Sequence, residues 1–78
     1  MSNHLLTPPI LRTLAAMSRH GYADRTKFGS ALSDWKWTVG GENTNGAVDR
    51  LVQRGLAVVV GAERNRVVLT DRGKRLVP

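Results

Sequence analysis

The 78-residue chain contains no cysteine, only two histidines and few aromatic residues. Without cysteine it can form neither a disulfide framework nor a thiolate site for zinc or an iron–sulfur cluster, and this composition fits a cytoplasmic protein. No apolar run approaches the ~20 residues that a membrane-spanning helix needs. Residues 1–7 also lack the basic start and apolar stretch of a signal peptide. We therefore expect a cytoplasmic protein with no membrane partner.

The sequence also lacks the residue patterns that are typical of enzymes. His4 and His20 lie far apart, and the six carboxylates are scattered rather than paired for acid–base chemistry. The glycines of Gly40-Gly41 are not followed by the Gly-Lys-Ser/Thr ending of a phosphate-binding loop. We expect no enzymatic activity, no metal site and no cofactor.

Basic residues, in contrast, are abundant. Twelve lysines and arginines face six acidic residues, which gives a net charge of +6, and 41% of the residues are hydrophobic. A chain of this length supports one small hydrophobic core and therefore one domain. A strong positive charge on so small a body favours polyanionic partners, chiefly nucleic acid.

Helical periodicity predicts three helices. The first spans about residues 8–20, with Thr7 as its N-cap, Pro8 in its first turn and Gly21 as its stop. A shorter second helix, capped by Asp24 or Thr26, is expected to end near Ser33, and a third spans about residues 43–54. The buried side chains expected on the second helix are Phe28, Ala31 and Leu32, and those on the third are Ala47, Val48, Leu51 and Val52.

Alternating segments predict strands. Residues 35–39 favour a brief strand that ends at Gly40-Gly41, and residues 56–60 and 66–70 favour a hairpin around a charged turn at 61–65. A last helical turn is expected over 71–76, capped by Thr70. The hairpin residues expected to face the core are Leu56, Val58, Val60, Val67 and Leu69. This leaves Ala57, Val59 and Val68 for the N-terminal segment or a second copy to cover, so a homodimer is a hypothesis.

Two segments carry a family resemblance. The stretch Val48–Leu56 is similar to the end of a recognition helix and the Gly-Leu that follows it. The stretch Glu63–Gly73 resembles a wing tip and its closing Leu-Thr-x-x-Gly. Together they resemble the winged helix-turn-helix core of MarR-type bacterial transcriptional regulators. The resemblance implies an α+β fold, with three helices, a small antiparallel sheet and a wing hairpin at 56–70. Residues 1–7 would be a lead-in, and residues 8–78 a single winged helix domain.

The resemblance also implies a function: sequence-specific binding of double-stranded DNA by a transcriptional regulator. The helix at 43–54 would enter the major groove, and the wing at 61–66 would meet the minor groove or the backbone. Asn and Gln side chains can pair with adenine and Arg with guanine. The candidate recognition-helix residues are Asn43, Thr44, Asn45, Gly46, Asp49, Arg50 and Gln53; the wing residues are Arg64, Asn65 and Arg66; the phosphate contacts are Lys27, Lys36, Arg72 and Lys74.

Other interpretations stay open at this point. Trp35 and Trp37 fall on the same side of their strand, where packing is the ordinary role of tryptophan; base stacking on them would need a single-stranded partner. A winged helix can also be a protein–protein interaction module, because a fold does not determine a function. A binder of structured RNA would share the same electrostatics.

Overall fold

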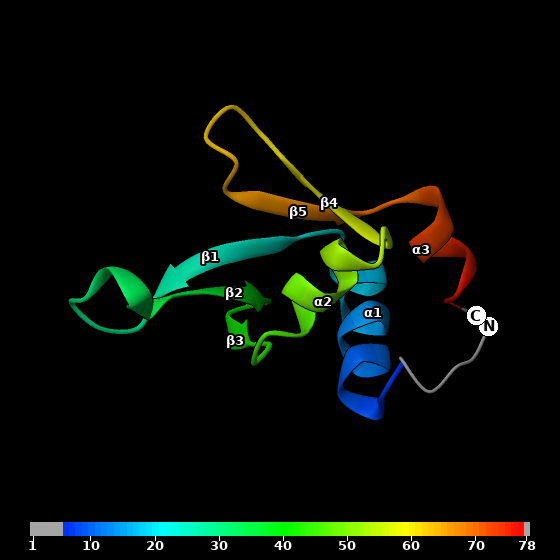
Figure 1. The fold of residues 1–78 in the computed structure, drawn as a ribbon, viewed down its shortest axis with the longest axis horizontal. Helices are drawn as coiled ribbons and strands as arrows, with labels where there is room; N and C mark the ends of the chain where they lie inside the picture. The colour runs from blue at the N-terminus through cyan, green and yellow to red at the C-terminus, as the bar shows by residue number, and fades with distance from the viewer. Residues whose placement is uncertain (1–5, 78) are drawn as a thin grey trace.

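The computed structural model describes residues 6–77, which form an α+β fold dominated by one five-stranded antiparallel sheet (Figure 1). The strand order is β3-β2-β1-β5-β4, with β1 at the centre. Of the expected lead-in over 1–7, residues 1–5, with His4, lie outside the described residues. The elements are α1 (Pro8–His20), β1 (Ala23–Lys27), the 3-10 turn η2 (Leu32–Asp34), β2 (Trp35–Val39), β3 (Glu42–Asn43), α2 (Ala47–Gln53), β4 (Ala57–Val60), β5 (Arg66–Leu69) and α3 (Asp71–Arg75).

The first helix has the bounds that the sequence predicts. Gly21 ends α1 in the left-handed conformation (φ 103°), and its N–H donates to the carbonyl of Met17 at 2.7 Å. Thr7 caps α1 with its backbone carbonyl, which accepts from the N–H of Leu11, rather than with its side chain. The buried stripe of Ile10, Leu14 and Met17 faces α2 and the sheet.

The expected second helix is wrong: its first half is strand β1. Burial along Ala23–Lys27 alternates with a period of two residues, as in a strand rather than a helix. Strand β1 pairs with β2 on one side and with β5 on the other. The side chains expected to be buried on the helix, those of Phe28, Ala31 and Leu32, are all exposed.

This strand overturns the winged helix prediction and the resemblance to MarR-type regulators. A helix-turn-helix needs a second helix before the recognition helix, and the chain has β1, η2, β2 and β3 there. The residues expected to form a wing, 56–70, are two strands of a five-stranded sheet and not a small appendage to three helices. The domain is therefore neither a helix-turn-helix nor a winged helix.

The expected third helix is shorter than predicted. Helix α2 begins at Ala47, because Asn45 and Gly46 both have positive φ values (53° and 84°) that no helix residue adopts. Asn43 belongs to β3, which β2 reaches through a two-residue turn at Gly40-Gly41. The predicted inward side chains of Ala47, Val48 and Leu51 are buried, and Val52 is half-buried.

The two strands of the predicted hairpin, the turn at 61–65 and the final helix are present, but the predicted inward face of β4 is wrong. Leu56, Val67 and Leu69 are buried as predicted, whereas Val58 is exposed and Ala57 and Val59 pack on the core in its place. Helix α3 packs on the segment before β4. The hydroxyl of Thr70 donates to the carbonyl of Gly55 at 2.8 Å and accepts from the N–H of Gly73 at 3.1 Å.

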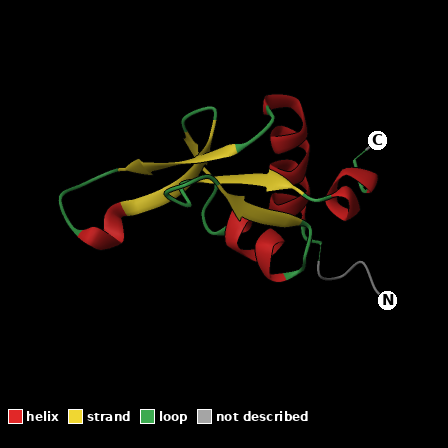
Figure 2. Ribbon diagram, turned by 90° about the horizontal axis from the view of Figure 1, so that it is seen from above, coloured by secondary structure: helices red, strands yellow, loops and turns green. Residues whose placement is uncertain are grey.

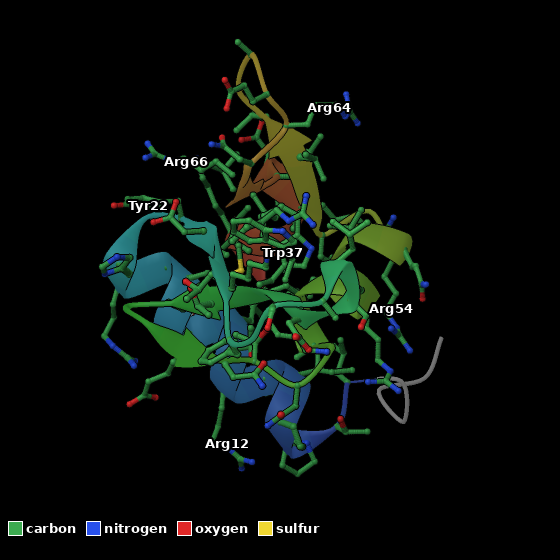
Figure 3. All side chains as sticks on the ribbon, turned by 90° about the vertical axis from the view of Figure 1, so that its left-hand side faces the viewer. Arg12, Tyr22, Trp37, Arg54, Arg64 and Arg66 are labelled. Carbon is green, nitrogen blue, oxygen red and sulfur yellow. The ribbon has the colours of Figure 1, made fainter. Side chains whose placement is uncertain are left out.

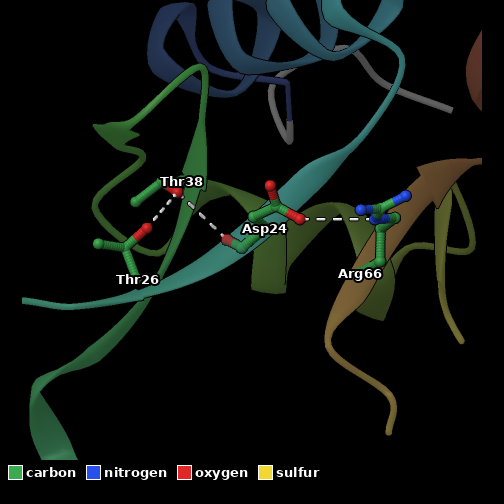
Figure 4. Close-up of polar contacts among 4 residues, drawn as sticks. All are labelled: Asp24, Thr26, Thr38 and Arg66. Carbon is green, nitrogen blue, oxygen red and sulfur yellow. Dashed lines mark hydrogen bonds and ion pairs between the residues drawn. The ribbon is translucent and has the colours of Figure 1, made fainter. Parts of the chain in front are cut away.

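Polar contacts on the face opposite to that of Ala23 join the central strands (Figure 4). The hydroxyl of Thr38 is 2.9 Å from that of Thr26 and donates to the carbonyl of Asp24 at 3.3 Å. The Asp24 carboxylate is 3.5 Å from Nε of Arg66 on β5. These contacts run from β2 through β1 to β5.

No helix formed by residues 6–77 has the length and apolar character needed to cross a membrane.

A substitution at Gly73 can test how tightly α3 packs. A Cβ added at this position would overlap the backbone carbonyl of Leu56, which cannot move away as a flexible side chain could. Gly73→Ala should therefore lower the free energy of unfolding by about 1–3 kcal/mol, although alanine normally stabilises a helix by about 1 kcal/mol relative to glycine. Urea unfolding followed by circular dichroism measures this change. Lys74→Ala, at an exposed neighbour, is the control and should be near neutral.

Candidate nucleic-acid interface

The β1–β2 hairpin projects from the body of the protein (Figure 1). We call residues 23–39 the arm and residues 28–34 its tip; η2 lies in the tip, away from the other helices (Figure 2). One face of the arm continues the core face of the sheet. Ala23 and Val39 are buried at its base, but the same face carries Arg25, Lys27, Trp35 and Trp37 farther out.

These four side chains form an alternating ladder of cations and indole rings. Cζ of Arg25 lies 5.5 Å from the ring centroid of Trp35 and 5.6 Å from that of Trp37. Nζ of Lys27 lies 5.8 Å from the ring of Trp35. A cation at such distances is attracted by the ring quadrupole, by about 0.5–1 kcal/mol at an exposed site. The tryptophans therefore hold two positive charges in place on the surface of the arm.

A hollow of about 380 Å³ separates the arm from the start of α2. We call it the arm hollow. The arm contributes Arg25, Lys36 and both tryptophans, and Asp49 is the single acidic residue on its lining. The opposite wall is the 43–46 turn, which brings Asn43, Asn45 and Gly46 from the predicted recognition helix to this position.

Local hydrogen bonds fix the shape of the 43–46 turn. The side-chain carbonyl of Asn43 accepts from the N–H of Asn45 at 2.9 Å. The hydroxyl of Thr44 donates to the carbonyl of Trp37 at 2.9 Å and ties the turn to the arm. The left-handed conformation of Asn45 leaves its side chain exposed, with no hydrogen bond of its own among the described residues. Two amide side chains are thus presented beside the cations of the arm.

A second hollow, of about 950 Å³, lies on the other side of this turn, between α1 and α2. We call it the helix hollow. Its lining includes four arginines, two on α1 and two on or directly after α2, and Glu42 is its single acidic residue. Nη1 of Arg54 donates to the carbonyl of Arg50 at 3.1 Å. Asn43 and Asn45 line both hollows, so the two meet at the turn. The arginines are Arg12, Arg19, Arg50 and Arg54.

The predicted wing residues lie apart from these hollows. Arg66 is engaged on β5, because it pairs with Asp24 and its Cζ lies 4.2 Å from the ring centroid of Tyr22. Arg64, in the 61–65 turn, points away from Arg66 (Figure 3). Asn65 is exposed in the same turn. The Arg66–Asp24 contact is the one ion pair within residues 6–77, so no other cation in this part of the chain is paired with a carboxylate.

The remaining predicted residues divide by position. Lys27 and Lys36 lie on the arm, and Asp49 and Arg50 lie on the exposed face of α2 beside the hollows. Gln53 is exposed on α2 but lines neither hollow. Arg72 and Lys74 lie on α3, at the end of the molecule opposite the arm (Figure 1).

Sequence reasoning did not identify Arg25, the two tryptophans, or three of the arginines of the helix hollow as interface residues. The signal for the ladder is the spacing of two in Arg25-x-Lys27 and in Trp35-x-Trp37, which becomes visible once both segments are treated as strands. Arg12, Arg19 and Arg54 carry no comparable local signal, because their proximity depends on how α1 packs on α2.

No protein-family model, no curated protein and no solved structure matches the chain. Within the described part of the chain, no group of three or more histidine or acidic side chains is arranged to hold a metal ion.

The two tryptophans should contribute differently to stability. Trp37 is half-buried and packs on the core, whereas Trp35 is 40% exposed. Trp37→Ala should lower the free energy of unfolding by roughly 2–3 kcal/mol, somewhat less than a fully buried tryptophan. Trp35→Ala should cost about 1 kcal/mol or less. Urea titrations followed by far-ultraviolet circular dichroism compare the two, and equal losses would contradict this packing.

Proposed function

We propose that the protein binds double-stranded DNA through the arm, the 43–46 turn and the two hollows beside it. The observation that carries the proposal is the cation–indole ladder, which holds Arg25 and Lys27 on a projecting hairpin next to exposed asparagines. The proposal keeps duplex DNA as the partner. The element that enters a groove is now the arm rather than α2, because α2 has only seven residues and begins after the asparagines.

The charge distribution supports a polyanionic partner. Arginines of α1 and α2 and cations of the arm converge around the 43–46 turn, and two acidic residues, Glu42 and Asp49, line the two hollows. Figure 3, which looks at the arm end-on, shows Arg12 and Arg54, two arginines of the helix hollow, at different positions around it. Phosphates spaced along a nucleic-acid backbone match such a distribution better than a single small anion does.

The shape of the arm favours a duplex over a single strand. Two-stranded β-ribbons can bind in either the major or the minor groove of duplex DNA. Single-strand binders instead use open aromatic faces on which bases stack. Here Arg25 lies over both indoles and Lys27 over one of them, so a cation already lies against each ring. The same cations are placed to contact phosphates.

The asparagines of the turn supply groups that can read bases. A side-chain amide both donates and accepts hydrogen bonds and can distinguish base edges. Since binding of this kind can be sequence-selective, we propose that the protein regulates transcription. We also propose that it acts in the cytoplasm, which its lack of cysteine favours.

A double substitution on the arm tests the interface. Arg25→Ala with Lys27→Ala should weaken binding to a mixed-sequence duplex roughly tenfold at 0.1 M salt, because two phosphate contacts are lost. If the interface neutralises about four to six phosphates, log K should fall against log salt with a slope of roughly −4 to −5 for the unmodified protein. The double variant should reduce that slope by about 2. Fluorescence anisotropy across a salt series measures both quantities.

The matched control is Arg72→Ala with Lys74→Ala, which removes the same charge from α3 at the opposite end. Equal effects of the two pairs would mean that net charge alone drives binding and would contradict the proposed interface. A double-stranded RNA competitor should displace the DNA poorly, since the grooves of A-form RNA differ in width and depth. Preference for RNA, or salt-insensitive binding to a protein without any DNA binding, would favour one of the other two interpretations.

Asn45 tests base recognition. Asn45→Gly removes the side chain but preserves the left-handed backbone that this position requires (φ 53°). If Asn45 contacts a base, the variant should bind duplexes selected from a random pool about 5- to 100-fold more weakly, while its binding to unselected DNA stays unchanged. Selection followed by sequencing, repeated with the variant, should show relaxed preference at one position. Gln53→Ala, on α2 outside the hollows, is the comparison and should leave the preference intact.

A further inference from the structure

The tip of the arm exposes two large apolar side chains. Phe28 is 55% exposed and Leu32 is 85% exposed, the highest value among the exposed large hydrophobic residues. Both lie in the seven-residue loop that joins β1 to β2, at one extreme of the long axis of the molecule (Figures 1 and 2). Neither contributes to the hydrophobic core. The exposure of these side chains therefore has no structural explanation within the described chain.

The tip is nevertheless well organised. The N–H of Phe28 donates to the carbonyl of Asp34 at 3.0 Å and closes the loop. The carboxylate of Asp34 accepts from the N–H of Ala31 at 2.9 Å. A Cβ on Gly29 would overlap this carboxylate, so glycine allows the close approach. An ordered loop presents its apolar side chains with less loss of conformational entropy on binding than a loose one.

The charges beside the tip indicate what it meets. Arg25 and Lys27 lie on the strand that leads into the tip, and Lys36 lies on the strand that leaves it. The single carboxylate of the tip, that of Asp34, is directed back to the loop's own backbone. Apolar side chains at the end of a cationic ribbon match a partner that is anionic outside and apolar inside. Duplex DNA has this structure, because phosphates line its grooves and stacked bases form its interior.

We propose that Phe28 and Leu32 form a wedge that enters between two base pairs from the minor groove and kinks the DNA. This inference rests on the proposed function and adds a specific mechanical outcome to it. Apolar wedges of this kind partly unstack a base step and bend the duplex by about 20–90°. Pyrimidine–purine steps such as TA unstack most easily, so the wedge selects flexible steps without hydrogen-bonding to their bases.

Bending the DNA would also bring it into contact with the rest of the proposed interface. An arm inserted by its tip brings phosphates of the flanking DNA toward the base of the arm, where the arginines of α1 and α2 line the helix hollow. Straight DNA contacts a projecting arm over a short length, whereas bent DNA can follow the surface toward the body of the protein. The wedge and the helix hollow would thus act on the same molecule of DNA.

The experiment uses the full chain and a duplex of about 30 base pairs, well below the ~150 base pairs over which DNA bends freely. The duplex carries a fluorophore at each end and 2-aminopurine at a central TA step. Binding of the unmodified protein should raise energy transfer between the ends and raise 2-aminopurine emission as the step unstacks. Phe28→Ser with Leu32→Ser should abolish both signals and weaken binding by no more than about tenfold. Val58→Ser with Leu76→Ser, which removes two exposed apolar side chains elsewhere, should leave both signals unchanged.

The outcomes separate the two proposals. If the unmodified protein fails to bind the duplex at low salt, the proposed function fails and the wedge with it. If it binds without either signal, or if the tip variant produces the same signals, duplex binding stands and the wedge is overturned. Binding to vesicles of anionic phospholipid that is lost in the tip variant, together with unchanged DNA bending, would assign the tip to a membrane surface and also overturn the wedge.

Discussion

The pairing of β1 with both of its neighbours is the interaction on which the rest of the structure depends. Ala23 is fully buried and lies opposite Val67 of β5, while the outer part of β1 pairs with β2. Two-stranded hairpins are marginally stable by themselves in water. By joining the β1–β2 and β4–β5 hairpins, β1 makes one sheet whose inner face packs on α1 and α2. The arm exists because this strand continues past the edge of that packed region.

Local signals in the sequence were sufficient for the elements that they describe directly. Pro8 and Gly21 delimit α1, the 61–65 turn separates β4 from β5, and Thr70 caps α3. They were insufficient for β1, because four of its five residues are polar and its alternation is too short to outweigh an apparent helix cap at Asp24. The residues Phe28 to Leu32 have helical spacing but lie in an exposed loop. The winged helix resemblance was carried by residues 48–56 and 63–73, but the fold that it implies needs the helix that is absent here.

The sequence also predicted part of the candidate site, where local patterns point to individual residues. The sequence predicted Asn43 and Asn45 as recognition-helix residues and Lys27 and Lys36 as phosphate contacts. The two asparagines lie before α2 rather than on a helix, but they line the arm hollow, and both lysines lie on the arm. What it could not supply was the register that sets Arg25 opposite Trp37, or the packing that gathers the arginines of α1 and α2. Both depend on contacts between residues far apart in the chain, which no local pattern encodes.

The face of the sheet that begins with Ala23 changes its role along its length. At the body it is apolar and buried, and farther out it carries exposed cations beside the indole rings. A substitution near the base therefore alters folding, whereas one near the tip alters only the surface offered to a partner. Binding preference can thus diverge among descendants of this chain while the scaffold stays the same, and an exchange of residues 28–34 alone would give a new surface on an unchanged body.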